Sequence, residues 1–363
     1  MTMSSQSSNI KHVFVCGLPR SGTSLLGRNV ARLEGCTGFK NTGVLEDEGQ
    51  FLQDVYRSDH EIGGAGAFGF HPDAHLTEAS PLLTPRNAER LRRCWERYWD
   101  TTKRLRIEKT PANLLMTRFL QAIFPNAYFV VIKRHPIAVS MATQKWKDSV
   151  RSLDYLFRHW LHCHQLFEQD KKYLNHVYEL RYEDYVNDSE RFHSEIAAFI
   201  GTHVPMTRKE ETFRSVRAWR KPAGRQVPEY AMESTNGAHN QRYFDRWTQL
   251  VRESPFRSYY LYLAARYEPR FAMWGYSIVD GFNLGSQAIA LRKSRKVVGP
   301  LLCTGADAIA LSRRFLAHIK EFIRITAKKV LPELIINKIR SARQEESVES
   351  EKRNVLLPQV VNR

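Results

Sequence analysis

The stretch that most constrains the fold of this chain is "FVCGLPRSGTSLL", residues 14–26. It begins as an apolar strand, turns between Gly17 and Gly22, and resumes as an apolar run with helical spacing. Residues Gly17 to Ser24 have the frame of a phosphate-binding loop, in which backbone N–H groups at the start of a helix surround an anion. Thr23 stands where a nucleoside triphosphatase needs lysine, so the loop predicts an anion site of a different kind.

Side chains in this turn supply the donors that a phosphate or a sulfate requires. Gly17 and Gly22 allow the backbone to approach the anion closely. The further donors are the guanidinium of Arg20 and the hydroxyls of Ser21, Thr23 and Ser24. Because such a string is a poor helix start without a stabilising partner, a functional loop is favoured over a plain polar bend.

The composition is that of a globular protein, with 363 residues, 42% hydrophobic and 26% charged. Five cysteines without paired spacing indicate neither a disulfide framework nor a zinc site, and they fit a reducing compartment. No apolar run precedes Val13, and no stretch approaches the roughly 20 apolar residues that span a bilayer. We therefore expect a cytoplasmic protein without a secretory signal or membrane span.

The net charge of +17 is concentrated towards the carboxyl terminus, where residues 281–363 hold 16 Lys and Arg against 7 Asp and Glu. Such a field favours anionic partners, whether nucleotides, polyanions or a lipid surface; nucleic acid is not expected. From about residue 284, apolar and basic residues interleave at helical spacing. This pattern fits a helix packed on the domain and equally a helix lying on the anionic inner surface of a membrane.

Strand-like and helix-like runs alternate between His12 and about Val279, which predicts an α/β fold with a parallel sheet flanked by helices. The predicted strands are 12–16, 105–108, 128–133 and 176–181, and the predicted helices are 22–34, 111–123, 136–147, 152–173, 189–200 and 255–267. In the second helix, Thr110 is the expected N-cap and Pro111 the first helical residue. The expected domains are a disordered 1–11, an α/β domain over 12–282, a basic amphipathic helical extension over 283–340 and a disordered tail over 341–363.

A long connection follows the first helix, from about 36 to 82, and it is rich in Gly, His, Pro and acidic residues. A loop of this length in a compact domain is usually functional, so we expect a lid or a substrate-facing loop. Its part "IGGAGAFGF", residues 62–70, is expected to be the most flexible.

A second anion site is indicated by "YFVVIKRHP", an apolar strand that ends in Lys133 and Arg134. A triphosphatase would place a Mg²⁺-binding aspartate at such a strand end, whereas a cation suits another phosphate. Parallel strands end at one edge of a sheet, where ligands bind, so Arg134 should lie near Arg20 and Thr23. Two anion sites without a metal ligand between them describe a nucleotide with phosphates at two separate places.

These motifs, "GLPRSGTSLL", "IEKTP", "FPNAYFVVIKRHPIAVS" and "LRYEDYVND" followed by "FIG", resemble those of the sulfotransferases that use 3′-phosphoadenosine 5′-phosphosulfate (PAPS). The resemblance covers about residues 12–280 and is closest in style to bacterial carbohydrate and protein-tyrosine sulfotransferases. It implies a phosphate-loop-like sulfotransferase fold and a metal-independent enzyme that transfers a sulfuryl group to an acceptor hydroxyl. The implied acceptor is a carbohydrate or a glycolipid.

The resemblance also assigns the donor site. It implies that Arg20, Ser21, Gly22, Thr23 and Ser24 hold the 5′-phosphosulfate. Arg134 would hold the 3′-phosphate, but the serine that usually assists it, eight residues later, falls here on Ala142. Ser140 and Thr143 are the nearby hydroxyls, and we favour Ser140.

Two further residues are candidates for the nucleotide site. Tyr182 in "RYEDY" corresponds to an aromatic position near the adenine, although packing in the core explains a tyrosine there nearly as well. Arg242 in "HNQRYFDRW" is a candidate to complete the site, with helix surface as the alternative.

Sulfuryl transfer by in-line displacement requires positioning of both reactants, positive charge at the leaving phosphate and a base for the acceptor proton. Arg20 and Lys109 are the candidates for the charge, because Lys109 ends its strand in "EKTP", where related enzymes keep a lysine. The alternative for Lys109 is a surface salt bridge with Glu108.

The candidate base lies in "GVLEDEGQFLQ", residues 43–53, where relatives place a catalytic glutamate after the first helix. Glu48 is the first choice and Glu46 the second. The competing interpretation is a solvated acidic turn that caps the next helix with Asp47 or Glu48. The alternative bases are His60, His71 and His75 in the long loop.

The cluster "HWLHCH", residues 159–164, has helical spacing that suits metal ligands, but no carboxylate is placed to orient a histidine. We expect core and surface histidines there, and no metal site. Two other function classes remain: a phosphate-loop kinase or triphosphatase, and a non-catalytic protein that binds polyanions or membranes through its basic tail.

Overall fold

The structure is a computed structural model, and it describes residues 10–145, 151–206, 240–282 and 284. The expected disordered tail lies outside the described residues, as do residues 1–9 of the expected disordered amino terminus and all but residue 284 of the basic helical extension. Lys11, the last residue expected to be disordered, is the first residue of a strand.

Five parallel strands form one sheet in the order β2-β3-β1-β4-β5, which confirms the predicted α/β fold. The strands are β1 (Lys11–Gly17), β2 (Cys36–Gly38), β3 (Leu105–Lys109), β4 (Ala127–Lys133) and β5 (Val177–Arg181). Helices cover both faces, so the central strands are apolar almost throughout. In β1, Phe14 and Cys16 enter one core while Val13 and Val15 enter the other, as the alternation of side chains along a strand requires.

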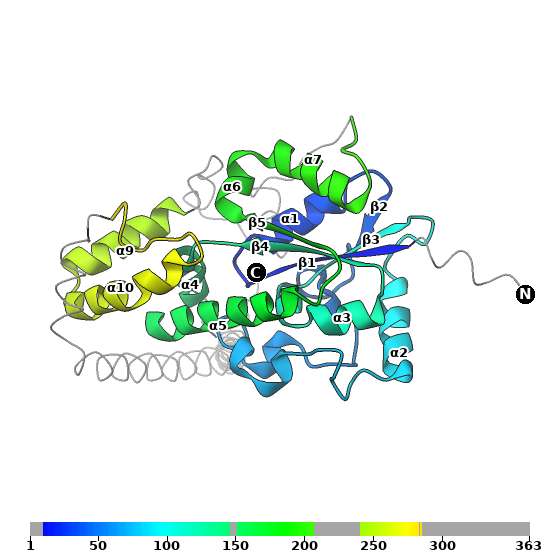
Figure 1. Ribbon diagram of the computed structural model, residues 1–363, viewed down its shortest axis with the longest axis horizontal. Coiled ribbons are helices and arrows are strands. Elements are labelled where there is room, and N and C mark those ends of the chain that lie inside the picture. Colours follow the sequence, from blue (N-terminus) through cyan, green and yellow to red (C-terminus); the bar gives the residue numbers. More distant parts are fainter. Residues whose placement is uncertain (1–9, 146–150, 207–239, 283, 285–363) are drawn as a thin grey trace, which may run out of the picture. The chain divides into compact units, whose positions relative to one another are not determined.

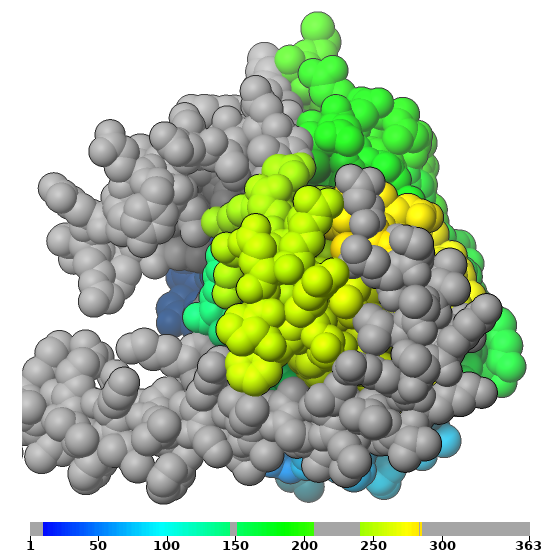
Figure 2. Space-filling model, turned by 90° about the vertical axis from the view of Figure 1, so that its left-hand side faces the viewer, coloured from blue at the N-terminus to red at the C-terminus, as the bar shows by residue number. Residues whose placement is uncertain are grey.

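One face of the sheet carries α1, α6 and α7, and the opposite face carries α2, α3 and α5, with α4, α9 and α10 packed at one end (Figure 1). In Figure 2, which views the molecule from that end, the surface of α9 and α10 lies in the foreground. The helix bounds are α1 (Thr23–Val30), α2 (Pro85–Glu96), α3 (Thr117–Ile123), α4 (Pro136–Gln144), α5 (Leu153–Lys171), α6 (Tyr182–Asn187), α7 (Ser189–Ile200), α9 (Gln241–Glu253) and α10 (Arg257–Ala272). Among the described residues, none of the helices combines the length and apolar character needed to cross a membrane.

The structure differs from the predicted helix over 111–123, and α2, α6 and α9 were not predicted. The expected helix over 111–123 is broken at Met116, which separates a 3₁₀ turn, η7 (Pro111–Leu115), from α3. Thr110 does not cap this turn with its side chain; its hydroxyl donates to Glu108 and accepts the Gln50 N–H. Helix α2 was not predicted, since only Ala88, Leu91 and Trp95 of its twelve residues are buried and the polar majority hides the pattern.

The long connection after β2 is built of five short 3₁₀ turns: η2 (Leu45–Asp47), η3 (Gly49–Phe51), η4 (Asp59–Ile62), η5 (Phe68–Phe70) and η6 (Pro72–Ala74). Its glycine-rich part packs on α5, where His159 Nε2 accepts the Gly69 N–H at 3.1 Å. A Cβ at Gly69 would lie 2.3 Å from Cys163 Sγ, so glycine permits this close approach. The connection therefore lies against the domain next to the carboxyl edge of the sheet.

The strand register brings the sequence motifs together. Val15 pairs with Lys109, Gly17 with Ile132, and Lys133 with Arg181, so four strands end at the same edge. This edge carries the phosphate loop, the end of "IEKTP" and the end of "VVIKRHP", as expected for a parallel sheet.

Candidate functional site

The phosphate loop connects β1 to α1 through a left-handed residue, Arg20 (φ 77°), and through Gly22 (φ 98°), the N-cap of α1. A Cβ at Gly22 would lie 2.5 Å from the Tyr182 ring, and a Cβ at Gly17 would lie 2.4 Å from the Ile132 carbonyl oxygen. Both glycines are thus required by the approach of the protein's own groups. The loop holds its backbone N–H groups at the start of α1, where the helix dipole favours an anion.

The three hydroxyls of the loop differ in their surroundings. Ser21 is fully buried, and its Oγ has no partner among the described residues. Thr23 is buried at the first position of α1. Ser24 donates to Glu46 Oε2 at 3.2 Å, which links the phosphate loop to the acidic segment.

Arg134 follows β4 and contacts the phosphate loop directly. Its Nη1 donates to the Arg20 carbonyl oxygen at 2.8 Å, and its Nε donates to Asn240 Oδ1 at 2.9 Å. The guanidinium carbon lies 4.1 Å from the centroid of the Tyr182 ring, in a cation–π arrangement. The side chain is therefore fixed beside the loop, where the sequence predicted Arg134 to lie.

Sequence reasoning missed the residues that orient Arg134. Asn240 donates from Nδ2 to Glu183 Oε1 at 2.6 Å, and the same oxygen accepts the His135 N–H at 3.0 Å. Glu183 stands in "RYEDY" and Asn240 in "HNQRYFDRW", but the predicted site residues of these stretches were the neighbouring Tyr182 and Arg242. No local signal identifies a contact between Arg134 and a residue 106 positions away.

Ser140 lies in α4 with its hydroxyl buried and without a partner among the described residues. Thr143, the alternative, donates to the Val139 carbonyl oxygen at 2.8 Å within the same helix. Ser140 also lines a small cavity of about 10 Å³ together with Leu18 and Pro19 of the phosphate loop. Of the two hydroxyls, only that of Thr143 donates a hydrogen bond to another described residue.

Tyr182 is the first residue of α6, and it is almost completely buried between Gly22 and Arg134. Burial raises the pKa of its hydroxyl to about 12, so the ring is neutral at physiological pH. Arg242 is exposed on α9, where it donates to the Tyr243 hydroxyl at 2.7 Å.

Glu48 and Lys109 form a buried ion pair at the end of β3. Lys109 Nζ lies 2.8 Å from Glu48 Oε1, and Gln50 Nε2 donates to Glu48 Oε2 at 2.7 Å. The exposed fractions of the two side chains are only 9% and 10%. The alternative of a surface salt bridge between Lys109 and Glu108 is wrong, because the partner of the lysine is Glu48 and the pair is shielded from water.

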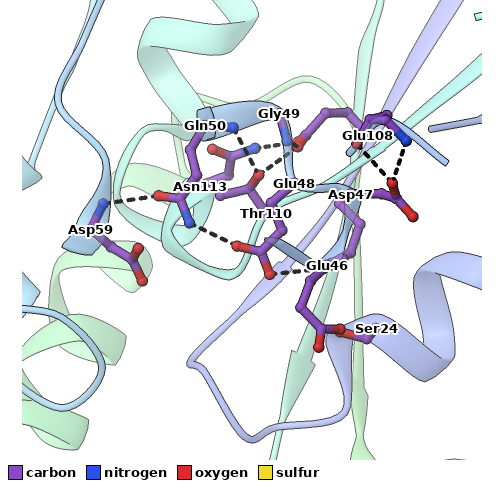
Figure 3. Close-up of polar contacts among 12 residues, drawn as sticks. Ser24, Glu46, Asp47, Glu48, Gly49, Gln50, Asp59, Glu108, Thr110 and Asn113 are labelled. Carbon is purple, nitrogen blue, oxygen red and sulfur yellow. Dashed lines mark hydrogen bonds and ion pairs between the residues drawn. The ribbon is translucent and has the colours of Figure 1, made fainter. Parts of the chain in front are cut away.

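The other two acids of "LEDE" are directed elsewhere (Figure 3). Glu46, at φ 55°, accepts the Ser24 hydroxyl, and Asp47 Oδ1 accepts both the N–H and the hydroxyl of Thr42 at 2.8 and 2.7 Å. Glu48 precedes η3 without capping it through its side chain. The interpretation of this segment as a solvated turn that caps the next helix is therefore wrong for Glu48.

The histidines of the long loop make contacts of their own. His75 Nε2 lies 2.8 Å from Asp170 of α5, His71 Nδ1 accepts the Asp73 N–H, and His60 is exposed next to Asp59. None of these contacts involves Glu48 or Lys109. Within the described part of the chain, no group of three or more His, Cys, Asp or Glu residues could hold a metal ion.

One cavity reaches Lys109, and a second reaches Gln50, the hydrogen-bond partner of Glu48. The first, of about 480 Å³, has Lys109 and Glu46 in its wall together with Gly27, Phe39 and Tyr98. Gly27 is needed here, since a Cβ would lie 2.8 Å from the Lys109 stem. The second, of about 970 Å³, is lined by residues between Gln50 and Leu82 and includes the partner amide of Glu48.

Comparison with known families gives a match of residues 12–206 to the Sulfotransferase family, which is more than half of the chain. The chain belongs to the sulfotransferase family. The matched region contains the phosphate loop, the Glu48–Lys109 pair and Arg134.

Solved sulfotransferase structures show weaker similarity. The sulfotransferase domain of the Synechococcus PCC 7002 olefin synthase is 16% identical, covering 65% of this chain and 88% of its own, with a TM-score of 0.39. The sulfotransferase domain from the curacin biosynthetic pathway is 14% identical, covering 74% and 98%, with a TM-score of 0.41. Sulfotransferase STF1 from Mycobacterium tuberculosis H37Rv is 15% identical, covering 64% and 76%, with a TM-score of 0.36. Comparison with curated protein sequences gave no match.

Proposed function

We propose that this sulfotransferase takes its sulfuryl group from PAPS and transfers it to a hydroxyl of a carbohydrate or glycolipid. The observation that carries the proposal is the continuity of the site. Arg134 contacts the backbone of Arg20, Ser24 contacts Glu46, and the buried Glu48–Lys109 pair ends the adjacent strand. Groups for two phosphates and for a proton transfer thus share one sheet edge.

In this proposal, the loop N–H groups hold the 5′-phosphosulfate with Arg20, Ser21, Gly22, Thr23 and Ser24. Arg134 binds the 3′-phosphate, with Ser140 as its hydroxyl partner and the Tyr182 ring near the adenine. The support is the position of Arg134 and Tyr182 against the loop and the available hydroxyls of Ser21 and Ser140. No metal ion is needed, because guanidinium groups and backbone donors carry the positive charge.

The reaction forms a bond between the acceptor oxygen and sulfur while the bond between sulfur and the 5′-phosphate oxygen breaks. Glu48 takes the proton of the acceptor hydroxyl, and Arg20 and Lys109 stabilise the leaving phosphate. The ion pair couples these roles. Once Glu48 is protonated, the charge of Lys109 is no longer neutralised and acts fully on the phosphate.

The proposed acceptor is supported by the cavities beside the pair. Each combines polar groups with aromatic rings, Phe39 and Tyr98 in the smaller one and Phe51 and Tyr56 in the larger one. Sugars present both hydroxyls and apolar ring faces, and such mixed walls suit them. The proposal also includes a cytoplasmic location and contact of the basic tail with an anionic membrane. Both are supported only by the amino-acid sequence.

The test is incubation with ³⁵S-labelled PAPS and a panel of glycans, glycolipids, peptides and phenols, with EDTA present throughout. The proposal expects label on a saccharide acceptor, and loss of it in Arg20→Ala. Label on a phenol or a peptide alone would refute the acceptor class. A kinase would instead require MgATP. Thermal shift distinguishes the kinase from the sulfotransferase, because MgATP should stabilise the first and 3′-phosphoadenosine 5′-phosphate the second. A ligand at 100 times its Kd adds about 2.7 kcal/mol to the free energy of unfolding.

A further inference from the structure

Glu108, the residue before Lys109, is a completely buried carboxylate. Its Oε1 accepts the Gly49 N–H at 2.9 Å and the Thr110 hydroxyl at 2.5 Å, and its Oε2 accepts Asn113 Nδ2 at 2.5 Å (Figure 3). All three donors are neutral. The carboxylate therefore binds the backbone of the segment that carries Glu48.

Glu108 and Lys109 hold this segment in complementary ways. Successive side chains of a strand point to opposite faces, so the two residues leave β3 in different directions. Lys109 binds the carboxylate of Glu48, and Glu108 binds the N–H of the next residue, Gly49. A Cβ at Gly49 would lie 2.6 Å from Glu108 Oε1, so only glycine allows this contact.

Residues 48–50, the segment that carries Glu48, make further hydrogen bonds. Trp95 Nε1 donates to the Gly49 carbonyl oxygen at 3.0 Å. The side chain of Gln50 bridges Glu48 Oε2 and the Asp59 N–H, at 2.7 and 2.9 Å. The N–H and the carbonyl oxygen of Gly49 and both carboxylate oxygens of Glu48 therefore have hydrogen-bond partners. These contacts leave the segment little conformational freedom.

We propose that Glu108 is a positioning residue that holds the Glu48 segment against Lys109 through the Gly49 N–H, which rests on the proposed roles of Glu48 and Lys109. In this role Glu108 acts as a hydrogen-bond acceptor for the Gly49 N–H, and its negative charge is not required. A buried charge that faces neutral donors is energetically costly, and burial raises the pKa of Glu108 to about 7.

This predicts different behaviour for two substitutions. Glu108→Ala removes the acceptor for Gly49. Glu108→Gln keeps an oxygen that can accept the Gly49 N–H. Asn113 Oδ1 has no partner among the described residues. If the Asn113 amide flips, this oxygen can accept a hydrogen bond from the new glutamine amide. The conservative variant should therefore rescue positioning.

A matched control is Asp154→Ala. Asp154 is also a buried carboxylate, and it accepts hydrogen bonds from Arg158, Arg266 and the Tyr267 hydroxyl. None of these partners belongs to the site. Its removal tests the general effect of deleting a buried carboxylate.

The experiment measures kcat and KM with labelled PAPS, and hydrogen–deuterium exchange of the peptide that covers residues 45–52, in the full chain and the three variants. Glu108→Ala should lower kcat by about 100-fold, the loss expected for a misplaced catalytic group, with KM for PAPS unchanged and faster exchange in that peptide. Glu108→Gln and Asp154→Ala should keep parental exchange there and most of the turnover.

Parental turnover or parental exchange in folded Glu108→Ala would overturn the inference, and so would an equal loss of turnover in Asp154→Ala. Hydrogen–deuterium exchange of this peptide can be measured whether or not the protein transfers a sulfuryl group. A parent protein that transfers no sulfuryl group would therefore count against the proposed function, while faster exchange confined to Glu108→Ala would still support the hold on the segment.

Discussion

The two sides of the site, at the carboxyl ends of β4 and β3, hold their cations differently. Arg134 on the β4 side is oriented by a carbonyl oxygen, an amide oxygen and an aromatic ring, whereas Lys109 on the β3 side is bound to the carboxylate of Glu48. The contacts of Arg134 with the loop backbone and Asn240 fix the position of its guanidinium, which suits a permanent phosphate contact. A carboxylate neutralises its lysine until a proton arrives, which suits a group needed during the reaction. In the proposed function, the β4 side therefore serves binding and the β3 side serves the chemistry.

The strongest way to break this comparison is Glu48→Gln, which removes the base and retains the shape of the side chain. Turnover should fall by about 10²–10⁴, the usual contribution of a general base, with unchanged affinity for 3′-phosphoadenosine 5′-phosphate. Single-turnover transfer and calorimetric titration measure the two quantities. Glu46→Gln is the control and should cost less. If Glu48→Gln turns over near the parental rate, the base is Glu46 or a histidine of the loop.

The next effect is on stability. Lys109→Ala leaves Glu48 buried without its cation, and breaking a buried pair in this way costs about 3–5 kcal/mol. Chemical denaturation of the variant at pH 7.5 measures the loss in the free energy of unfolding. The double variant Lys109→Ala with Glu48→Gln should recover most of it, because no unpaired charge remains. A double variant no more stable than Lys109→Ala would show that the pair is not the source of the loss.

The pH dependence of stability sharpens the β3 side. Burial raises the pKa of Glu108 from its ordinary 4.5 to about 7, so the folded state binds this proton more tightly than the unfolded state. The stability that this proton contributes is complete below about pH 4.5 and is lost as the pH rises through 7. Between pH 4.5 and 8, Glu108→Gln should therefore gain about 3 kcal/mol relative to the parent protein. Denaturation curves at several pH values measure this difference, and parallel profiles for the two proteins would contradict it.

The smallest effects are expected on the β4 side. Arg134→Ala should weaken binding of 3′-phosphoadenosine 5′-phosphate by about 1.5–3 kcal/mol, the usual worth of hydrogen bonds to charged groups. Asn240→Ala removes only the amide that orients the guanidinium and should cost less, at about 1 kcal/mol. Titration with adenosine 5′-phosphate, which lacks the 3′-phosphate, is the control, because neither variant should change its affinity. An equal loss with both nucleotides would place the 3′-phosphate elsewhere.

The sequence predicted those features that follow from local motifs and parallel topology. The strand before Gly17, the turn at Gly22 and the placement of Arg134 at the same edge needed only the apolar pattern and the rule that parallel strands end together. The partner of Lys109 could not be predicted, because Glu48 lies 61 residues away and the adjacent Glu108 offered a plausible pair. Contacts that depend on how a long irregular loop folds have no periodic signal.

The roles of Gly49 and Asn240 were missed for the same reason. Gly49 matters because Glu108, 59 residues later, approaches its backbone, and Asn240 matters because it meets Arg134 and Glu183. Neither residue type is unusual in its local sequence. Helix α9, whose N-cap is Asn240, has only Tyr243, Trp247 and Val251 buried, so its pattern was too sparse to predict.

The most direct test is a crystal structure with 3′-phosphoadenosine 5′-phosphate soaked in from a solution that contains Mg²⁺. The account predicts the 5′-phosphate on the N–H groups of residues 17–24 and the 3′-phosphate on Arg134, with Lys109 facing the 5′-phosphate and no metal between them. A nucleotide bound elsewhere, Arg134 turned away from it, or a magnesium ion bridging its phosphates would contradict the account.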